Sequence, residues 1–173
     1  LSLLDAYKDD IDYRMNGSQP SNATGYKFNF TELDDGIVFK DDNLTVEAFK
    51  VNHGEFEDAY GFRFTSKDKV IVFSGDTGPS KSLEDYAKDA DILVHEVYSY
   101  AGFLKKTKDW QIYHKSHHTS TYEVGEIASR AKPKLLVLSH ILFWGADEQD
   151  ILEETRTTFG GNIKIAEDLM VIK

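Results

Sequence analysis

Side chains that can bind metal stand at the ends of four apolar runs in the sequence. His53 follows "FKVN", Asp76 follows "VFSG", the pair His95 and Glu96 follows "ILV", and His140 follows "LLVLS". A buried histidine held by a backbone hydrogen bond is the commoner explanation for any one of them. Together they indicate a convergent site, because the apolar runs behind them carry almost no charge. Imidazole and carboxylate without thiolate suit Zn²⁺, and also Mn²⁺ or Fe²⁺.

A second histidine pair, His117 and His118, stands just before a helix start in "SHHTSTYEV". A histidine beside the first turn of a helix is placed to hold an anion. An ordinary helix cap with a surface histidine explains the same pattern when it is taken alone. The pair therefore supports a functional site only in combination with the strand-end residues.

The elements that must position these residues change in type along the chain. Short segments rich in β-branched and aromatic residues predict strands. They cover residues 36–40, 44–51, 59–66, 69–74, 91–96, 134–140, 162–166 and 169–173. Helical periodicity predicts helices over 80–90, 120–131 and 146–159, with Ser80 or Ser82 capping the first and Ser120 and Glu123 forming a capping box in the second. A loop through Trp110 is expected between the strand 91–96 and the second helix.

This order of elements predicts the fold class. Consecutive strands followed by alternating strands and helices indicate an α/β (α+β) fold, with an open sheet covered by helices on at least one face. In such sheets ligands gather at the carboxyl ends of the strands. The four apolar runs with polar endings are therefore expected to meet at one edge.

Composition narrows the class of partner. The chain has 173 residues, with 20 Lys and Arg against 30 Asp and Glu, so its formal net charge is −10. This balance disfavours a nucleic-acid partner, because negative charge repels a phosphate backbone. No apolar run approaches the ~20 residues that span a bilayer, so we expect a soluble chain without a membrane partner. The absence of cysteine excludes thiolate sites and leaves the compartment undetermined.

With these residues in order, the sequence resembles a metallo-β-lactamase-fold hydrolase of the ribonuclease Z-like and arylsulfatase-like branch. Five motifs occur in the family's order: "VNHGEFEDAYGFRF", "VFSGDT", "ILVHEVY", "HHTSTYEVGEIA" and "LLVLSH". His118 and His140 are 22 residues apart, as in ribonuclease Z-like enzymes. The resemblance implies that residues 1–173 form a single partial domain, the carboxyl-terminal half of a four-layer αββα sandwich.

The resemblance also implies a centre of two divalent metal ions, with zinc as the first choice and manganese or iron as alternatives. By this likeness His53 binds the first ion, Asp76 bridges both ions and His140 binds the second. His118 then faces the leaving group of the substrate without binding metal, and Glu96 orients His118. Two metal ions about 3.5 Å apart lower the pKa of a bridging water and neutralise the oxyanion of the transition state.

Two departures from the family pattern affect the expected function. The His-x-His-x-Asp-His motif does not occur in the 173 residues. We therefore expect it upstream of Leu1, and we expect this segment alone to bind metal weakly and to be inactive. Ribonuclease Z has a long insertion that binds tRNA between the strands corresponding to "YGFRF" and "VIVFS". Here only "TSKDK" joins these two predicted strands, which argues against tRNA processing.

The leading interpretation is a metal-dependent hydrolase of a small ester: a sulfate ester, a cyclic nucleotide or other phosphodiester, or a lactone. The alternatives are a tRNA 3′-end processing endonuclease of the same fold and a non-catalytic remnant with structural histidines. His95 is expected to be structural. Aromatic residues between Tyr98 and Trp144 flank the motifs and either line a pocket for an aryl group or belong to the core or an interface, which leaves a homodimer open.

Overall fold

The computed structural model of the protein describes residues 3–18, 21–22, 24–27 and 31–172. The chain divides into two units, one ending at Glu32 and one beginning at Leu33. The first unit contains the helices α1 (Leu3–Ala6) and α2 (Lys8–Asn16). No side chain of α2 is buried, and two ion pairs between residues four apart lie on its surface.

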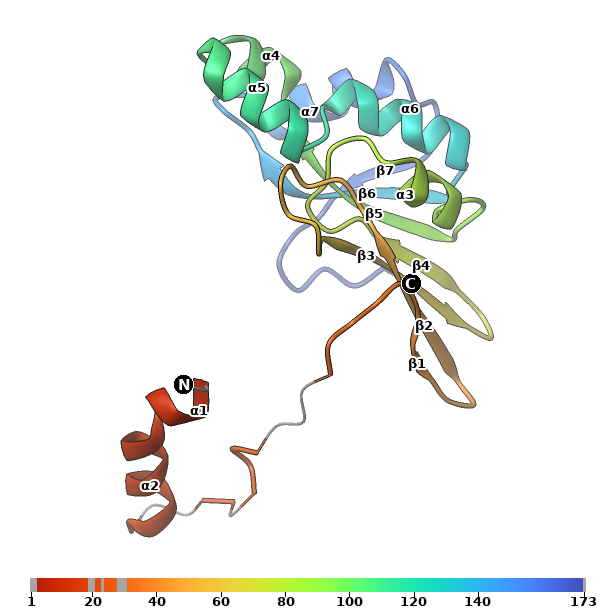
Figure 1. The fold of residues 1–173 in the computed structure, drawn as a ribbon. Coiled ribbons are helices and arrows are strands. Elements are labelled where there is room, and N and C mark those ends of the chain that lie inside the picture. The colour runs from red at the N-terminus through yellow and green to blue at the C-terminus, as the bar shows by residue number, and fades with distance from the viewer. Residues whose placement is uncertain (1–2, 19–20, 23, 28–30, 173) are drawn as a thin grey trace. The chain divides into compact units, whose positions relative to one another are not determined.

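The second unit is built on a seven-stranded sheet whose strands lie side by side in chain order (Figure 1). The strands are β1 (Gly36–Lys40), β2 (Leu44–Lys50), β3 (Tyr60–Ser66), β4 (Val70–Phe73), β5 (Ile92–Tyr98), β6 (Leu135–Leu142) and β7 (Ile163–Ile165). The strands from β1 to β4 pair antiparallel, and those from β4 to β7 pair parallel. The change occurs where helices begin to connect the strands, because parallel neighbours need a crossover.

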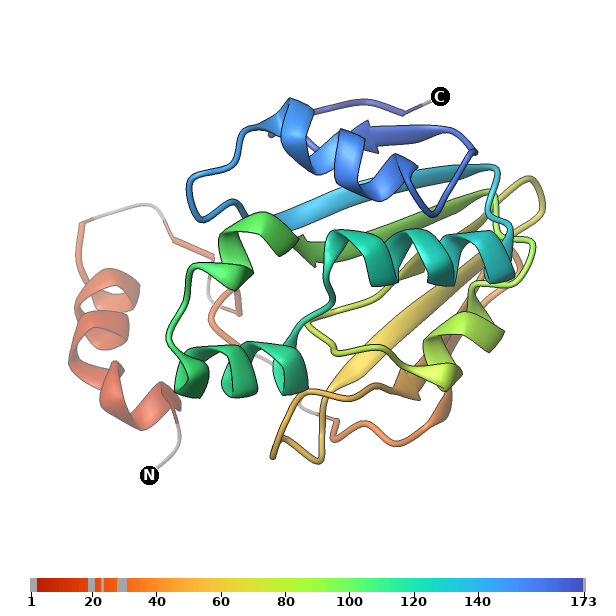
Figure 2. The same cartoon turned by 90° about the horizontal axis from the view of Figure 1, so that it is seen from above.

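The helices of this unit lie over one face of the sheet (Figure 2). They are α3 (Lys81–Tyr86), α4 (Tyr100–Leu104), α5 (Lys108–His117), α6 (Thr121–Ala131) and α7 (Glu148–Arg156). The core between the two layers includes Val72, Leu93 and Leu136, which occupy one row across three neighbouring strands. The predicted sheet with helices on at least one face is confirmed.

Local capping explains where the predicted helices begin. The Ser80 hydroxyl accepts a hydrogen bond from the N–H of Leu83, so Ser80 caps α3. Ser120 and Glu123 form the predicted capping box of α6. Such caps satisfy N–H groups that have no partner within the helix.

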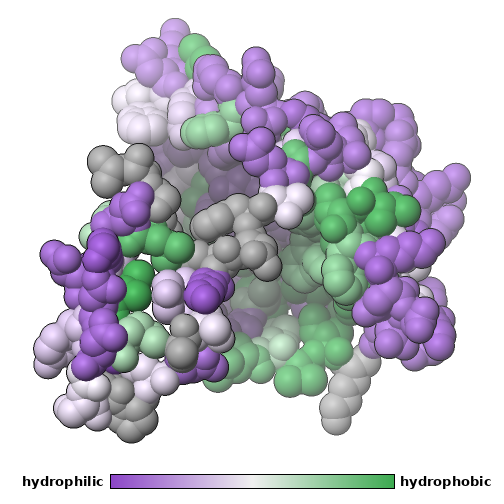
Figure 3. Space-filling model, turned by 60° about the horizontal axis from the view of Figure 1, so that its bottom comes forward, coloured by the Kyte–Doolittle hydropathy of each residue, from purple (hydrophilic) through white to green (hydrophobic). Residues whose placement is uncertain are grey.

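The other face of the sheet presents aromatic side chains. Val72 and Arg63 pair in register and face the helices, since Val72 lies in the core and Arg63 donates to the carbonyl of Tyr86 in α3. Alternation therefore turns their neighbours Phe62 and Phe73, which pair with each other, to the opposite face. Figure 3 brings this side of the molecule forward and shows areas of hydrophobic surface.

The segment around Trp110 is helical, so the loop predicted there is wrong. It forms α4 and α5. Local patterns do not predict α5, because His117 is its one buried residue and Thr107 at its start makes no side-chain capping bond. Neither an apolar stripe nor a capping box marks this helix.

The strand predicted over residues 169–173 is also wrong for 169–172, and Lys173 lies outside the described residues. Leu169 has a φ of 63° and is almost fully exposed, and the N–H of Met170 bonds back to Glu167 in a turn. A positive φ interrupts an extended strand.

Within the described part of the chain, no helix is long and apolar enough to cross a membrane.

Candidate metal centre

Asp76 stands just beyond the end of β4, as predicted. The N–H of Ser74 still bonds to Val94 of the neighbouring strand, and Gly75 then turns the chain with a φ of 61°. A Cβ atom at Gly75 would lie 2.6 Å from the carbonyl oxygen of Tyr60. Glycine is therefore required here both for the backbone conformation and for the close approach. The turn delivers the Asp76 carboxylate on a rigid strand end.

His140 lies inside β6, which corrects the prediction that it ends the strand. β6 continues to Leu142, and its register with β5 shifts so that Ser139 and Ile141 are paired while His140 is left out. The φ of His140 is 43°, a conformation that non-glycine residues rarely adopt. A bulge of this kind redirects a side chain out of the normal alternation. β5 likewise continues to Tyr98, past Glu96.

Asp76, His118 and His140 converge. Each of them offers one ligand atom, and these atoms lie within 4.8 Å of one another. Nε2 of His140 is 3.8 Å from Oδ2 of Asp76. The rings of His118 and His140 are stacked, with their centroids 5.8 Å apart and their planes 14° apart.

The donor set of this cluster fits a divalent cation. Two atoms that each lie about 2.1 Å from one ion can be at most about 4.2 Å apart. The 3.8 Å between His140 and Asp76 meets this limit, and the whole cluster is only a little wider. Two imidazoles and a carboxylate are ligands that zinc, manganese and iron accept.

Glu96 lies next to His118 and is buried. Its Oε1 accepts a hydrogen bond of 2.7 Å from the N–H of Thr119, and its Oε2 is 3.3 Å from Nδ1 of His118. The Ser74 hydroxyl in turn accepts from the N–H of Glu96. Thr119 and His118 therefore contact the two carboxylate oxygens, and Ser74 fixes the backbone of Glu96. The carboxylate contacts the imidazole that it was predicted to orient.

Burial and this contact move both pKa values. Burial raises the pKa of Glu96, and the contact with His118 opposes that rise. For His118, burial lowers the pKa, but the hydrogen bond and charge of Glu96, with the charge of Asp76, outweigh it and leave the pKa raised. A raised pKa favours the protonated imidazole.

His53 lies beside this cluster but is not one of its three members. Its ring centroid is 5.5 Å from that of His118, and its Nδ1 is 2.9 Å from the carbonyl oxygen of His117. An imidazole nitrogen facing a carbonyl carries the hydrogen, so Nε2 of the neutral ring retains its lone pair. This tautomer is the one that a metal ligand needs. The role of His53 as a ligand stays a prediction, as do those of the other site residues.

His95 lies away from the cluster, in the core. It is fully buried, and burial lowers its pKa to about 4. Nδ1 of His95 is 2.6 Å from the backbone oxygen of Glu96. Alternation along β5 places His95 and Glu96 on opposite faces of the sheet. This placement agrees with the expectation that His95 is structural.

An aromatic pocket adjoins the cluster and was not predicted. It has a volume of about 410 Å³ and joins Asp76, Glu96 and His140 to side chains of β3 and β4. The apolar wall includes Phe64 and Phe73, whose rings meet edge to face at 5.6 Å. The alternation of "YGFRFTS" places Phe62 and Phe64 on one face, but nothing in the sequence indicates that this face adjoins the site.

Fold and site together define a metal-centre protein of the metallo-β-lactamase type. Its marks are one sheet with one helical layer, and a cluster of histidine and carboxylate groups that β4 and β6 help to form. The family model described as "Beta-lactamase superfamily domain" matches residues 4–141. The chain belongs to this family, which confirms the predicted fold. Members of this fold family bind divalent metal ions, and the cluster of Asp76, His118 and His140 is the candidate place for one.

Curated relatives carry the name ribonuclease Z, which confirms the predicted ribonuclease Z-like resemblance. The protein from Archaeoglobus fulgidus is 36% identical over 108 residues, which cover 62% of this chain and 33% of that protein. The protein from Mycobacterium sp. (strain KMS) is 28% identical over 171 residues, which cover 97% of this chain and 59% of that protein. The chain thus spans from a third to about six tenths of the length of these relatives.

Solved structures share the fold at lower identity. The metallo-beta-lactamase fold protein YhfI from Bacillus subtilis has a TM-score of 0.61 and 21% identity, over 75% of this chain and 49% of its own. The short form of human tRNase Z has a TM-score of 0.56 and 22% identity, over 79% of this chain and 46% of its own. These likenesses concern the fold.

Proposed function

We propose that the protein containing this chain is a metal-dependent hydrolase that cleaves a phosphodiester, with an RNA 3′ end as the first candidate substrate. The observation that carries the proposal is the contact between Glu96 and His118 beside the cluster of Asp76, His118 and His140. The relatives named ribonuclease Z support the RNA substrate. They weigh against the expectation, drawn from the net charge and from the short connection "TSKDK", that nucleic acid is disfavoured.

In this proposal Asp76, His140 and His53 hold two divalent metal ions, with zinc as the first choice, and His118, the remaining member of the cluster, does not bind them. When bound, such ions lower the pKa of a coordinated water and stabilise negative charge on the reacting oxygens. Asp76 is suited to bridging because a carboxylate has two oxygens. The tautomer of His53, set by the carbonyl of His117, leaves Nε2 available as a donor atom.

His118 is proposed to donate a proton to the leaving oxygen. Because Glu96 engages Nδ1, Nε2 is the nitrogen left to face the substrate. The contact with Glu96 raises the pKa of His118 against the effect of burial, which favours the protonated form that a proton donor needs. Glu96 is a positioning residue, since it contacts the imidazole and acts through it.

A small ester remains the second candidate substrate, because of the connection between β3 and β4. Only residues 67–69 separate Ser66, the last residue of β3, from Val70, the first of β4. The family resemblance leads us to expect a long insertion at this place in a tRNA-processing enzyme. The aromatic pocket beside the cluster, about 410 Å³, is large enough for a small aryl ester.

The test compares four substrates with the intact, metal-loaded protein: a precursor tRNA, bis(4-nitrophenyl) phosphate, a cyclic nucleotide and 4-nitrophenyl sulfate. We expect cleavage of the phosphodiesters, abolished by a chelator and restored by zinc, manganese or iron. Cleavage of the sulfate ester alone would overturn the phosphodiester assignment. Cleavage of small phosphodiesters without precursor tRNA would make the second candidate the function.

A matched pair of variants tests the positioning role of Glu96. Glu96→Gln keeps the shape and an oxygen for Thr119 but removes the charge beside His118, so we expect the pKa of His118 and the turnover to fall while metal content is kept. NMR titration of the histidine reports the pKa directly. Glu126→Gln, an exposed change on α6, is the control and is expected to alter neither the pKa of His118 nor the turnover. An unchanged pKa in Glu96→Gln would refute the role.

A further inference from the structure

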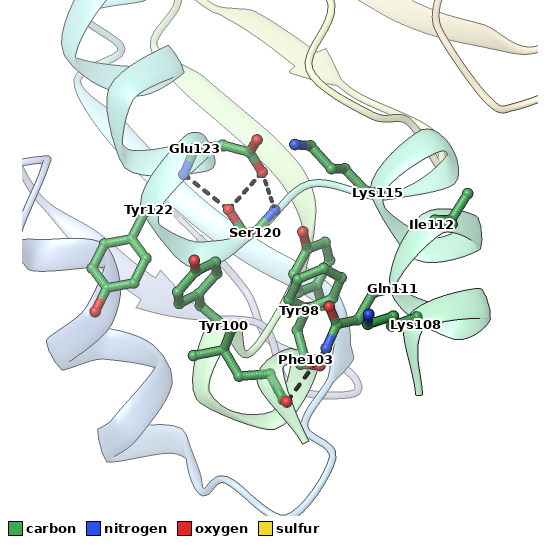
Figure 4. Close-up of a pocket in the computed structure, with 11 residues that line it drawn as sticks. Tyr98, Tyr100, Phe103, Lys108, Gln111, Ile112, Lys115, Ser120, Tyr122 and Glu123 are labelled. Carbon is green, nitrogen blue, oxygen red and sulfur yellow. Dashed lines mark hydrogen bonds between the residues drawn. The ribbon is translucent and has the colours of Figure 1, made fainter. Parts of the chain in front are cut away.

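A second pocket lies apart from the candidate metal centre. Its volume is about 760 Å³, within the range of small-molecule sites. Side chains of α4, of α5 and of the first turn of α6 line it, with Tyr98 at the end of β5 (Figure 4). It shares no lining residue with the aromatic pocket beside Asp76.

Aromatic rings form one side of this α4–α5–α6 pocket. The rings of Tyr98 and Phe103 are stacked with centroids 5.1 Å apart, and the ring of Tyr100 lies 5.9 Å from Phe103. Tyr100 also meets Tyr122 edge to face at 5.1 Å. Leu104 adds an exposed apolar side chain. Surfaces of this kind accept a planar ring by stacking.

Two lysines on α5 give the pocket its charge. Lys108 and Lys115 both line it, and neither forms an ion pair with any residue in the described ranges. They are seven residues apart on one helix, so their backbones are separated by about 10 Å. Figure 4 shows Lys115 extending toward the space between α5 and α6. Unpaired cations at a pocket are notable in a chain whose net charge is −10.

The one carboxylate in the pocket offsets only one of the two positive charges. Glu123 is the third lining residue with a charge, but its Oε2 accepts hydrogen bonds from both the N–H and the hydroxyl of Ser120. The same contacts occupy the start of α6, so the helix N-terminus is not available to an incoming anion. The groups left to receive an anion are the two lysine ammonium groups.

We propose that the α4–α5–α6 pocket binds a small molecule made of an aromatic ring carrying a phosphate or sulfate group. The ring lies against Tyr100, Tyr122 and Leu104, with the buried rings of Tyr98 and Phe103 behind them, and the anion meets Lys115 or Lys108. Apolar walls without cations would favour a neutral ring, and cations without apolar walls would favour inorganic phosphate. The combination favours a ligand that has both parts, such as a nucleotide or an aryl phosphate. This inference does not depend on the proposed hydrolysis.

Calorimetric titration of the full chain in the presence of EDTA tests the proposal, because the chelator removes metal from the candidate centre. The probes are adenosine 5′-monophosphate and 4-nitrophenyl phosphate, with adenosine and inorganic phosphate as single-part controls. We expect saturable binding of at least one two-part probe, at least about tenfold tighter than either control. Tighter binding of adenosine 5′-monophosphate indicates a nucleotide ligand, and tighter binding of 4-nitrophenyl phosphate indicates an aryl ester. Absence of saturable binding by both overturns the proposal.

Variants at exposed positions locate the binding. Lys115→Gln and Tyr100→Ala are each expected to weaken binding of the tighter probe at least threefold, whereas Lys67→Gln, in the connection between β3 and β4, leaves it unchanged. Equal affinity in all three variants overturns the assignment to this pocket. A second copy of the chain is the competing occupant of this surface. A dimer in light scattering that Ile112→Lys dissociates, together with no probe binding, would establish that occupant instead.

Discussion

The buried histidine His95 should make the folded state sensitive to acid. Nδ1 of His95 faces the backbone oxygen of Glu96 at 2.6 Å, so Nδ1 carries the hydrogen of the neutral ring. Nε2 has no hydrogen-bond partner among the described residues. Protonating it would place a charge and a second N–H in the core without an acceptor, and burial accordingly lowers the pKa of His95 to about 4.

The direction and size of the effect follow from linkage. In the unfolded chain His95 binds a proton near its ordinary pKa of 6.5, whereas in the folded chain it does so only near 4. Stability from the neutral imidazole is therefore fully present above pH 6.5 and is lost as the pH falls through 6.5 toward 4. The gap between the two pKa values corresponds to about 3 kcal/mol. That is a large share of the roughly 5–15 kcal/mol that stabilises a typical domain.

Urea unfolding at pH 7, 6, 5 and 4, followed by circular dichroism in the presence of EDTA, measures this loss. His95→Gln, which does not titrate and has a similar volume, serves as the reference. The free energy of unfolding of the wild type should fall by about 3 kcal/mol more than that of the variant between pH 7 and 4. Only the slopes are compared, because the substitution itself changes the stability at every pH. Parallel slopes would refute the reasoning.

Two further predictions concern the candidate centre, and a third concerns the stability of the fold. Asp76→Asn should sharply lower the metal content of the intact protein by mass spectrometry, whereas Asp85→Asn, an exposed carboxylate on α3, should not. His118→Ala should lower turnover with metal content kept, and loss of metal would make His118 a ligand. Gly54→Ala should lower the free energy of unfolding by about 1–3 kcal/mol, since Gly54 has a φ of 58° and its Cβ would lie 2.1 Å from the buried ring of His117. Gly160→Ala, where a Cβ meets nothing within 4 Å, should have a smaller effect in the same urea titration.

Local residue patterns predicted helices and strands correctly where a residue type has a specific structural role. Ser120 and Glu123 predicted the start of α6, because a capping box satisfies N–H groups that no other part of the chain can reach. Short apolar runs predicted the seven strands of the sheet, and the run in β5 is nearly continuous because that parallel strand is buried along almost its whole length. The helices α4 and α5 were missed because they expose most of their apolar side chains, which removes the periodic signal.

The sequence by itself determined the order of the seven strands and of α3, α6 and α7. It also determined the set of side chains available for a metal: His53, Asp76, His118 and His140. Tertiary structure decided how they meet. The bulge at His140 turns its imidazole out of the β6 alternation, and the end of α5 brings His118 to Asp76 from more than 40 residues away along the chain. Distances between such remote residues depend on how helices pack on the sheet, and no local pattern of residues encodes them.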